Sequence, residues 1–181
     1  MQSVRVLFRP IALCSIFAAQ NLPMKTFFYV LLAGAILFSQ ASCLKKDSSQ
    51  PCTPASVASE EPTILAYAAN NGIFVTHHSS GLAYQIISTG SGATPSVNSK
   101  VFVTYTGKLL DGGVFDQQAD SSKTGWVLGS LIPGWQIGLP LIQKGGEIKL
   151  IIPSSLAYGC DDSRLPANSI LYFDVHLLDV K

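Results

Sequence analysis

Large aromatic residues that stand beside turns are the side chains of this sequence that point to a chemical role. They are Tyr105, Phe115, Trp126, Trp135, Tyr158 and Phe173, and they come from several separate segments. Each of them alone is more often a core residue than part of a site. Together, aromatics from separate segments can wall a concave apolar pocket in which a few polar groups orient a ligand. Asp116 and Tyr158 are the candidates for those polar groups.

Motifs for covalent or metal catalysis are missing from the chain, which has neither a G-x-S-x-G nucleophile elbow nor an H-E-x-x-H zinc motif. His77 and His78 are adjacent, so they cannot both face one metal from a regular element. His176 is isolated in an expected strand. We therefore expect solvated or hydrogen-bonded histidines, and neither a metal nor a cofactor.

Strand patterns dominate the second half of the chain. The segments 82–88, 100–109, 147–153 and 169–180 are rich in β-branched and aromatic residues, and several alternate between apolar and polar positions. Asp-Gly-Gly at 111–113 predicts a tight turn. Between the strands, the short stretch after Pro133 is the one segment that looks helical. This pattern predicts an α+β domain in which an antiparallel sheet folds over that helix.

A second short helix is expected before the strands, within residues 60–79. Ser59 is a suitable N-cap, Glu60-Glu61 suits the positive end of the helix, and Pro62 is tolerated in a first turn. Asn70-Asn71-Gly72 is a stop signal. The remainder of 60–79 then connects this helix to the first strand.

Length and charge favour one domain that does not bind nucleic acid. The chain has 181 residues, a formal net charge of +1 and only 13% charged residues, with no basic block. The high hydrophobic content, 48%, is concentrated before residue 44. The remainder has an ordinary polar composition.

Residues 24–43 have the layout of a secretory signal segment. Lys25 precedes an uncharged apolar run over 27–38, and small residues follow it. The run is shorter than the roughly 20 residues of a membrane-spanning helix. Cys43 comes directly after the small residues and resembles the lipid-modified cysteine of bacterial lipoproteins, although Gln40 departs from the usual aliphatic residue. Lipidation at Cys43 is the favoured interpretation; plain secretion and an uncleaved anchor are the alternatives.

Residues 1–23 hold a weaker apolar stretch interrupted by Arg9 and Pro10. Our hypothesis is that they are a mis-annotated extension and that translation begins at Met24. Residues 44–59, rich in Ser, Pro and charge, are interpreted as a flexible tether. Cys52 and Cys160 can pair in an oxidising compartment or remain two separate thiols, and the sequence leaves both open.

Four motifs make the chain similar to a known family. VTYTGKLLDGGVFD, WVLGSLIPGWQIGL, LIIPSSLAYG and LPANSILYFDVHLLDV, in that order, resemble the FKBP-type peptidyl-prolyl isomerases from near Gly81 to Val180. The resemblance implies a strongly bent antiparallel β-sheet wrapped around one short α-helix, over 80–181. It also implies catalysis of cis–trans interconversion at X-Pro bonds, and the N-terminal layout is similar to that of exported bacterial members.

The resemblance assigns the aromatic residues to a catalytic pocket. Tyr105, Phe115 and Phe173 match its walls and Trp135 matches its floor. Tyr158 matches a loop tyrosine that donates its hydroxyl to the substrate.

Further positions match the edge of the same pocket. Leu131 and Ile132 match an aliphatic pair whose backbone contacts the ligand, while Trp126 and Leu165 are expected nearby. Asp116 is expected to orient Tyr158 or the pocket edge. The implied ligands are proline-containing polypeptides and macrolide inhibitors.

The chain departs from the family at the rim of the pocket. The loop Gly159–Leu165 is short and carries Asp161, Asp162 and Arg164, and Ala167 replaces the second proline of a usual Pro-Pro pair. These changes bear on sequence preference, rate and macrolide affinity. Two alternatives to an enzyme therefore stay open: a chaperone that binds proline segments with little turnover, and an envelope lipoprotein that retains only the fold. The N-terminal helix looks short for dimerisation, so a monomer is expected.

Overall fold

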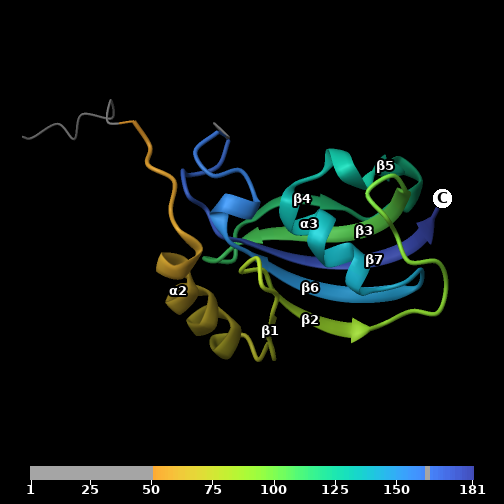
Figure 1. The fold of residues 1–181 in the computed structure, drawn as a ribbon, viewed down its shortest axis with the longest axis horizontal. Coiled ribbons are helices and arrows are strands. Elements are labelled where there is room, and N and C mark those ends of the chain that lie inside the picture. The colour runs from red at the N-terminus through yellow and green to blue at the C-terminus, as the bar shows by residue number, and fades with distance from the viewer. Residues whose placement is uncertain (1–50, 162–163) are drawn as a thin grey trace, which may run out of the picture. The chain divides into compact units, whose positions relative to one another are not determined.

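Antiparallel pairing joins every described strand into one seven-stranded sheet in the computed structural model (Figure 1). The strands are β1 (Thr76–His77), β2 (Ala83–Ser88), β3 (Lys100–Leu109), β4 (Val114–Gln118), β5 (Trp126–Val127), β6 (Gly146–Ile152) and β7 (Leu171–Val180). They neighbour one another in the order β1-β2-β6-β7-β3-β4, and β5 pairs with β3 beside that path. The two longest strands, β3 and β7, therefore lie together inside the sheet.

The structure describes residues 51–161 and 164–181, which belong to one folding unit, Gln50–Lys181. The expectations for 1–23, for the signal segment 24–43 with its Cys43, and for the first part of the tether fall outside the described residues. Across 51–161 and 164–181, we find no helix with the length and apolar character needed to cross a membrane.

Helix α3 (Pro133–Gly138) lies against one face of the sheet (Figure 1). Pro133 suits the first helical position because its missing N–H would have no partner there. Two glycines let the helix approach β6: a Cβ on Gly134 would lie 2.5 Å from Ile152, and one on Gly138 would lie 2.7 Å from Leu150. The predicted α+β fold is confirmed. Short 3-10 helices complete the connections at Ser121–Lys123, Leu128–Ser130, Leu139–Leu141 and Ser154–Leu156.

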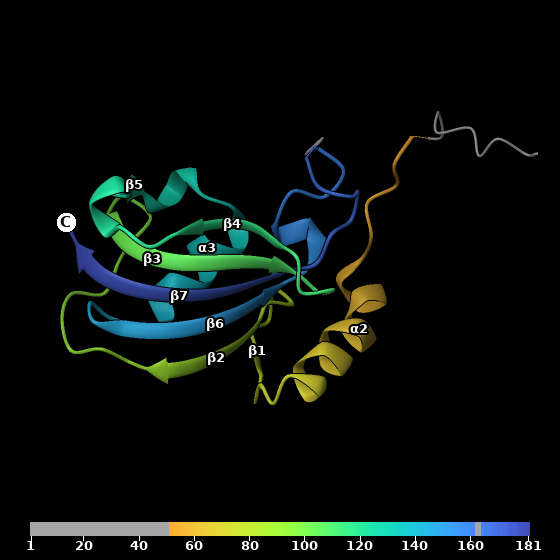
Figure 2. The ribbon, with the colours of Figure 1, turned by 180° about the vertical axis from the view of Figure 1, so that it is seen from behind.

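Two apolar clusters occupy opposite faces of β6, because successive side chains of a strand alternate between faces. Ile148, Leu150 and Ile152 point into the main core beneath α3. Ile151 points into a second cluster, formed with helix α2 (Val57–Asn70). Figure 2 shows α2 beside β1 at one end of the sheet, apart from α3.

Helix α2 begins earlier than expected and corrects the boundary of the tether 44–59. Its N-cap is Ser56, whose hydroxyl accepts the Ser59 N–H at 3.2 Å, so Ser59 lies inside the helix. Pro62 is consequently inside the helix and not in its first turn. Because the helix starts earlier, Glu60 lies in its first turn and faces the protein. There the buried residue Ser154 donates hydrogen bonds to the carboxyl group of Glu60. The predicted stop is confirmed, with Asn71 as the C-cap.

A disulfide joins Cys52 to Cys160 across 108 residues of sequence, with their Cα atoms 5.8 Å apart. The sequence alone left this pairing open because it supplies no distance between the two segments. The bond fastens the residues before α2 to the loop that follows the Ser154–Leu156 turn.

The second cluster predicts how α2 contributes to stability. Ile64 is fully buried, whereas its neighbour Leu65 is 44% exposed. We expect Ile64→Ala to lower the free energy of unfolding by about 2–5 kcal/mol, and Leu65→Ala to change it by about 0.5 kcal/mol or less. Urea denaturation of both variants measures the difference. Equal losses would show that α2 does not pack on the sheet through this face.

Candidate functional site

A cavity of about 340 Å³ opens between α3 and the strands β3, β5 and β7. It gathers eight of the ten pocket residues predicted from the sequence, together with Ser130, which the sequence did not suggest. Its lining residues are Tyr105, Asp116, Trp126, Ser130, Leu131, Ile132, Trp135, Tyr158 and Phe173. The mix of aromatic walls and a few polar groups is typical of a small-ligand site.

The aromatic rings pack edge to face around Phe173. Its centroid lies 5.3 Å from that of Trp135 at 86° and 5.5 Å from that of Phe115 at 82°. Tyr105 stands at 89° to Trp135, with 5.2 Å between centroids. Such edge-on pairs are a favoured aromatic geometry, and each one restricts the rotation of its neighbours. Contacts between the rings therefore set the orientation of the cavity walls.

Gly107 makes room for two of these rings. It lies in β3 on the same face as Tyr105, and a Cβ there would lie 2.7 Å from Phe173 and 2.9 Å from Phe115. Any larger residue would push the rings apart. Glycine inside a strand pattern often marks such a close approach, so this signal was present in the sequence but was not used.

Phe115 and Leu165 do not line the main cavity. With Asp116, Tyr158 and Arg164 they line an adjoining hollow of about 300 Å³. Asp116 and Tyr158 line both spaces, so they stand on the boundary between them. The two spaces together form a site that can take a small apolar ring in the main cavity and flanking groups beside it.

The phenol of Tyr105 donates a hydrogen bond to Asp116 Oδ2 at 2.8 Å. Burial raises the pKa of Tyr105 above its usual value, and the hydrogen bond and charge of Asp116 raise it further. Tyr105 therefore stays protonated at neutral pH. The sequence predicted that Asp116 would orient Tyr158 or the pocket edge; the pairing with Tyr105 was not foreseen.

The backbone of Leu131 and Ile132 is held in place from α3. Gln136 Nε2 donates to the carbonyl of Leu131 at 2.6 Å and to that of Gly129 at 3.2 Å. Ile132 is the N-cap residue of α3, and its amide has no acceptor among residues 51–161 and 164–181. An N–H in this position can donate to a bound ligand. Gln136 is a further residue that the sequence did not single out.

The floor residue Trp135 is buried, at 4% exposure. Its indole N–H has no hydrogen-bond partner among the described residues. Buried unpaired donors are rare in native proteins and call for a local explanation. The edge-on packing against Tyr105 and Phe173 fixes the indole in this position.

A larger hollow of about 750 Å³ lies on the other face of β3 and β7, where Thr104, Thr106 and Asp174 point. Most of its lining residues are polar or charged, with Tyr105, Ala119 and Tyr172 among them, so we do not assign it a ligand. On this face His176 Nε2 lies 2.7 Å from Glu147 Oε2. His78 bonds to Ser80 at 2.9 Å, so these histidines are hydrogen-bonded as expected. Over the described ranges we find no group of three potential metal ligands.

A family model described as FKBP-type peptidyl-prolyl cis-trans isomerase matches residues 92–178. The isomerase FkpA of Escherichia coli (strain K12) is 47% identical over 105 residues, which are 57% of this chain and 39% of that protein. FkpA of Aeromonas hydrophila is 40% identical over 123 residues, 67% of this chain and 45% of that protein. The chain thus spans less than half the length of these curated relatives.

Solved structures show the same likeness. The crystal structure of Escherichia coli FkpA superposes with a TM-score of 0.59 and 35% identity, covering 89% of this chain and 74% of that one. A peptidyl-prolyl cis-trans isomerase of Pseudomonas syringae pv. tomato superposes with a TM-score of 0.58 and 28% identity, covering 71% and 98%. Residues 92–178, which the family model matches, include every residue that lines the main cavity.

The Tyr105–Asp116 pair predicts how the phenol titrates. We expect Asp116→Asn to lower the pKa of Tyr105 because the carboxylate charge is lost. The pKa should stay above the usual value of about 10, because burial is the larger cause of the shift. Carbon-13 NMR of labelled tyrosine across a pH series measures this, with Tyr105→Phe to identify the resonance. An unchanged pKa in Asp116→Asn would contradict the pairing.

Proposed function

The chain belongs to the FKBP-type peptidyl-prolyl cis-trans isomerase family, and on this premise we propose that it accelerates cis–trans isomerisation of X-Pro bonds in exported polypeptides. The observation that carries the proposal is the aromatic cavity, with hydrogen-bond donors at its edge. Its size and apolar walls suit a proline ring. The relatives are named as isomerases, which does not favour the alternative of a chaperone with little turnover.

The reaction requires no nucleophile, because no bond is made or broken. Rotation about a peptide bond faces a barrier of about 18–20 kcal/mol, since resonance gives the C–N bond partial double-bond character. The twisted transition state has lost that resonance, and its carbonyl is less polar than that of the planar amide. An apolar cavity that excludes water therefore binds the twisted state better than the planar state, and this differential binding lowers the barrier.

Each residue of the cavity has a role in this proposal. Trp135 contacts the proline ring as the floor, and Tyr105 and Phe173 are walls. Phe115 supports Phe173 from the adjoining hollow. The Ile132 N–H and the Tyr158 hydroxyl hold the backbone of the substrate.

The remaining pocket residues shape and orient this cavity. Leu131 and Trp126 close its edge, and Leu165 bounds the adjoining hollow where the chain beside the proline lies. Asp116 orients the phenol of Tyr105 and adds a negative charge at the boundary of the two spaces. A direct proton transfer by Asp116 is not needed, because isomerisation moves no proton.

Export and lipid anchoring are part of the same proposal. The signal layout of residues 24–43 supports export, and the Cys52–Cys160 disulfide suits an oxidising compartment. Cys43 would carry the lipid and attach the protein, as a monomer, to the bacterial cell envelope. Mass spectrometry of the mature N-terminus tests this: a lipid-modified Cys43 is expected, and an unmodified terminus would leave plain secretion.

The test of the activity is a protease-coupled isomerisation assay on a proline tetrapeptide. We expect Phe115→Ala and Asp116→Ala each to lower kcat/KM by about ten-fold, the effect of roughly 1.4 kcal/mol of lost transition-state binding. A macrolide inhibitor that fills the cavity should suppress turnover of the unmodified protein.

Val114→Ala is the matched control, because Val114 neighbours Phe115 in β4 but is 52% exposed and lines neither space. It should leave kcat/KM unchanged, and circular dichroism should show that all three variants are folded. Full activity in both Phe115→Ala and Asp116→Ala would refute this site. Refolding activity without peptide turnover would instead indicate a chaperone.

A further inference from the structure

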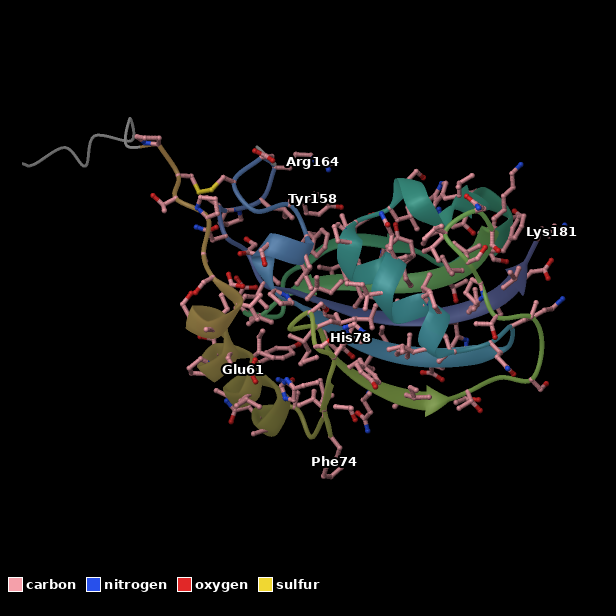
Figure 3. All side chains as sticks on the ribbon, in the orientation of Figure 1. Glu61, Phe74, His78, Tyr158, Arg164 and Lys181 are labelled. Carbon is pink, nitrogen blue, oxygen red and sulfur yellow. A yellow bond between two sulfur atoms is a disulfide. The ribbon has the colours of Figure 1, made fainter. Side chains whose placement is uncertain are left out.

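The segment before and at the start of α2, residues 52–60, makes a set of contacts with the part of the chain that carries Tyr158. We call residues 52–60 the strap and residues 154–160 the Tyr158 loop. The strap lines neither the main cavity nor the adjoining hollow. Its contacts reach the Tyr158 loop at both ends, and Figure 3 shows the disulfide beside the labelled Tyr158 and Arg164.

At the beginning of the loop, the strap is fastened through a buried carboxyl group. Glu60 is 6% exposed and Ser154 is 1% exposed. Glu60 Oε2 accepts the Ser154 N–H at 2.9 Å, and Glu60 Oε1 accepts the Ser154 hydroxyl at 2.5 Å. A buried carboxyl group is costly unless it is hydrogen-bonded, and an apolar residue would pack there more simply. Glu60 therefore specifies a position for Ser154 more than it adds stability.

At the end of the loop, the strap is fastened by the disulfide and by Asn168. Cys52 is bonded to Cys160. Asn168 Oδ1 accepts the Ala55 N–H at 3.1 Å, and Asn168 Nδ2 donates to the Thr53 carbonyl at 2.9 Å. Asn168 holds a left-handed backbone, with φ of 58°, the single such non-glycine residue in the described ranges. Asparagine tolerates this conformation better than most residues, and the strap satisfies its side chain.

These contacts converge on the residue next to Tyr158. The Gly159 N–H donates to the Ser154 carbonyl at 2.9 Å, and the Gly159 carbonyl accepts the Asn168 N–H at 2.8 Å. Ser154 is held by Glu60, and Asn168 is held by Ala55 and Thr53. The backbone directly after Tyr158 is thus tied on both sides to residues that the strap holds.

We propose that the strap positions Tyr158 for the substrate, with Glu60, Ser154, Asn168 and the Cys52–Cys160 disulfide as positioning residues. This rests on the proposed isomerase function, in which the Tyr158 hydroxyl holds the substrate backbone. The strap itself touches no reacting atom. Its effect reaches the cavity through the backbone on either side of Tyr158, since the N–H groups of Ala157 and Gly159 both donate to the Ser154 carbonyl.

The experiment opens the disulfide in the full chain and measures both the loop and the kinetics. Dithiothreitol reduces the bond to two thiols and is itself oxidised to a cyclic disulfide. We expect faster hydrogen–deuterium exchange at amides 154–160. We also expect a loss of about five-fold in kcat/KM, chiefly through KM, because Tyr158 binds the ground state and the transition state alike.

Reduction of the Tyr158→Phe variant with dithiothreitol distinguishes the positioning of the Tyr158 hydroxyl from a general loosening of the loop. With the hydroxyl absent, reduction should change kcat/KM by less than about two-fold, because coupled residues are not additive. Cys52→Ser combined with Cys160→Ser should behave as the reduced protein does and should not respond to dithiothreitol. Glu60→Ala should also raise KM, with Glu61→Ala as the matched control, since Glu61 pairs with His77 at the surface.

Each outcome of these measurements either supports or overturns the proposal that the strap positions Tyr158. Unchanged exchange at 154–160 on reduction, or an equal loss of kcat/KM in the unmodified protein and in Tyr158→Phe, would overturn it. If the oxidised protein shows no turnover at all, the isomerase proposal fails. Hydrogen exchange, together with proline-peptide binding measured by tryptophan fluorescence, then judges the strap by itself; Trp126 and Trp135 both line the cavity and both contribute to that signal.

Discussion

Edge-to-face packing of aromatic rings on Phe173 is the interaction on which the rest of the site depends. Phe173 is 3% exposed and lies in β7, at the centre of the sheet. The rings of Phe115 and Trp135 stand edge-on to it, and the ring of Tyr105 is tilted against it. Each ring comes from a different element, so the cavity forms only when β3, β4, β7 and α3 are all in place. The absence of a side chain at Gly107 is as necessary as the rings, because it leaves the space they occupy.

In the proposed isomerisation, the bond would rotate against apolar walls with fixed hydrogen-bond donors beside them. Burial and Asp116 raise the pKa of Tyr105, and Gln136 holds the backbone near Ile132. These groups do not need to move or to exchange protons during isomerisation. Fixed donors and apolar walls cost no reorganisation at the transition state, which is the general basis of electrostatic preorganisation.

The two faces of the sheet carry different parts of the structure. One face carries α3 and the aromatic cavity, while Ile151 and Tyr172 on the other face receive α2. Because α2 is fixed on the second face, the strap, which ends in the first turn of α2, can reach the Tyr158 loop, which belongs to the first face. The helix thereby links the packing of one face to the geometry of the other.

The sequence by itself determined four of the seven strands (β2, β3, β6 and β7), the short helix and most of the pocket. The period-2 pattern of 100–109 and the Asp-Gly-Gly turn specify β3 and its hairpin locally, and the four motifs name the aromatic residues. Ser130 and Gln136 were missed because their contribution is a distance to a neighbour, which no local pattern encodes; for Gly107, its place inside a strand pattern was a local signal. The tertiary structure alone decided that Ser56 caps α2, that Glu60 meets Ser154 and that Cys52 meets Cys160. The last two contacts join residues about a hundred positions apart, and only the folded sheet brings such segments within bonding distance.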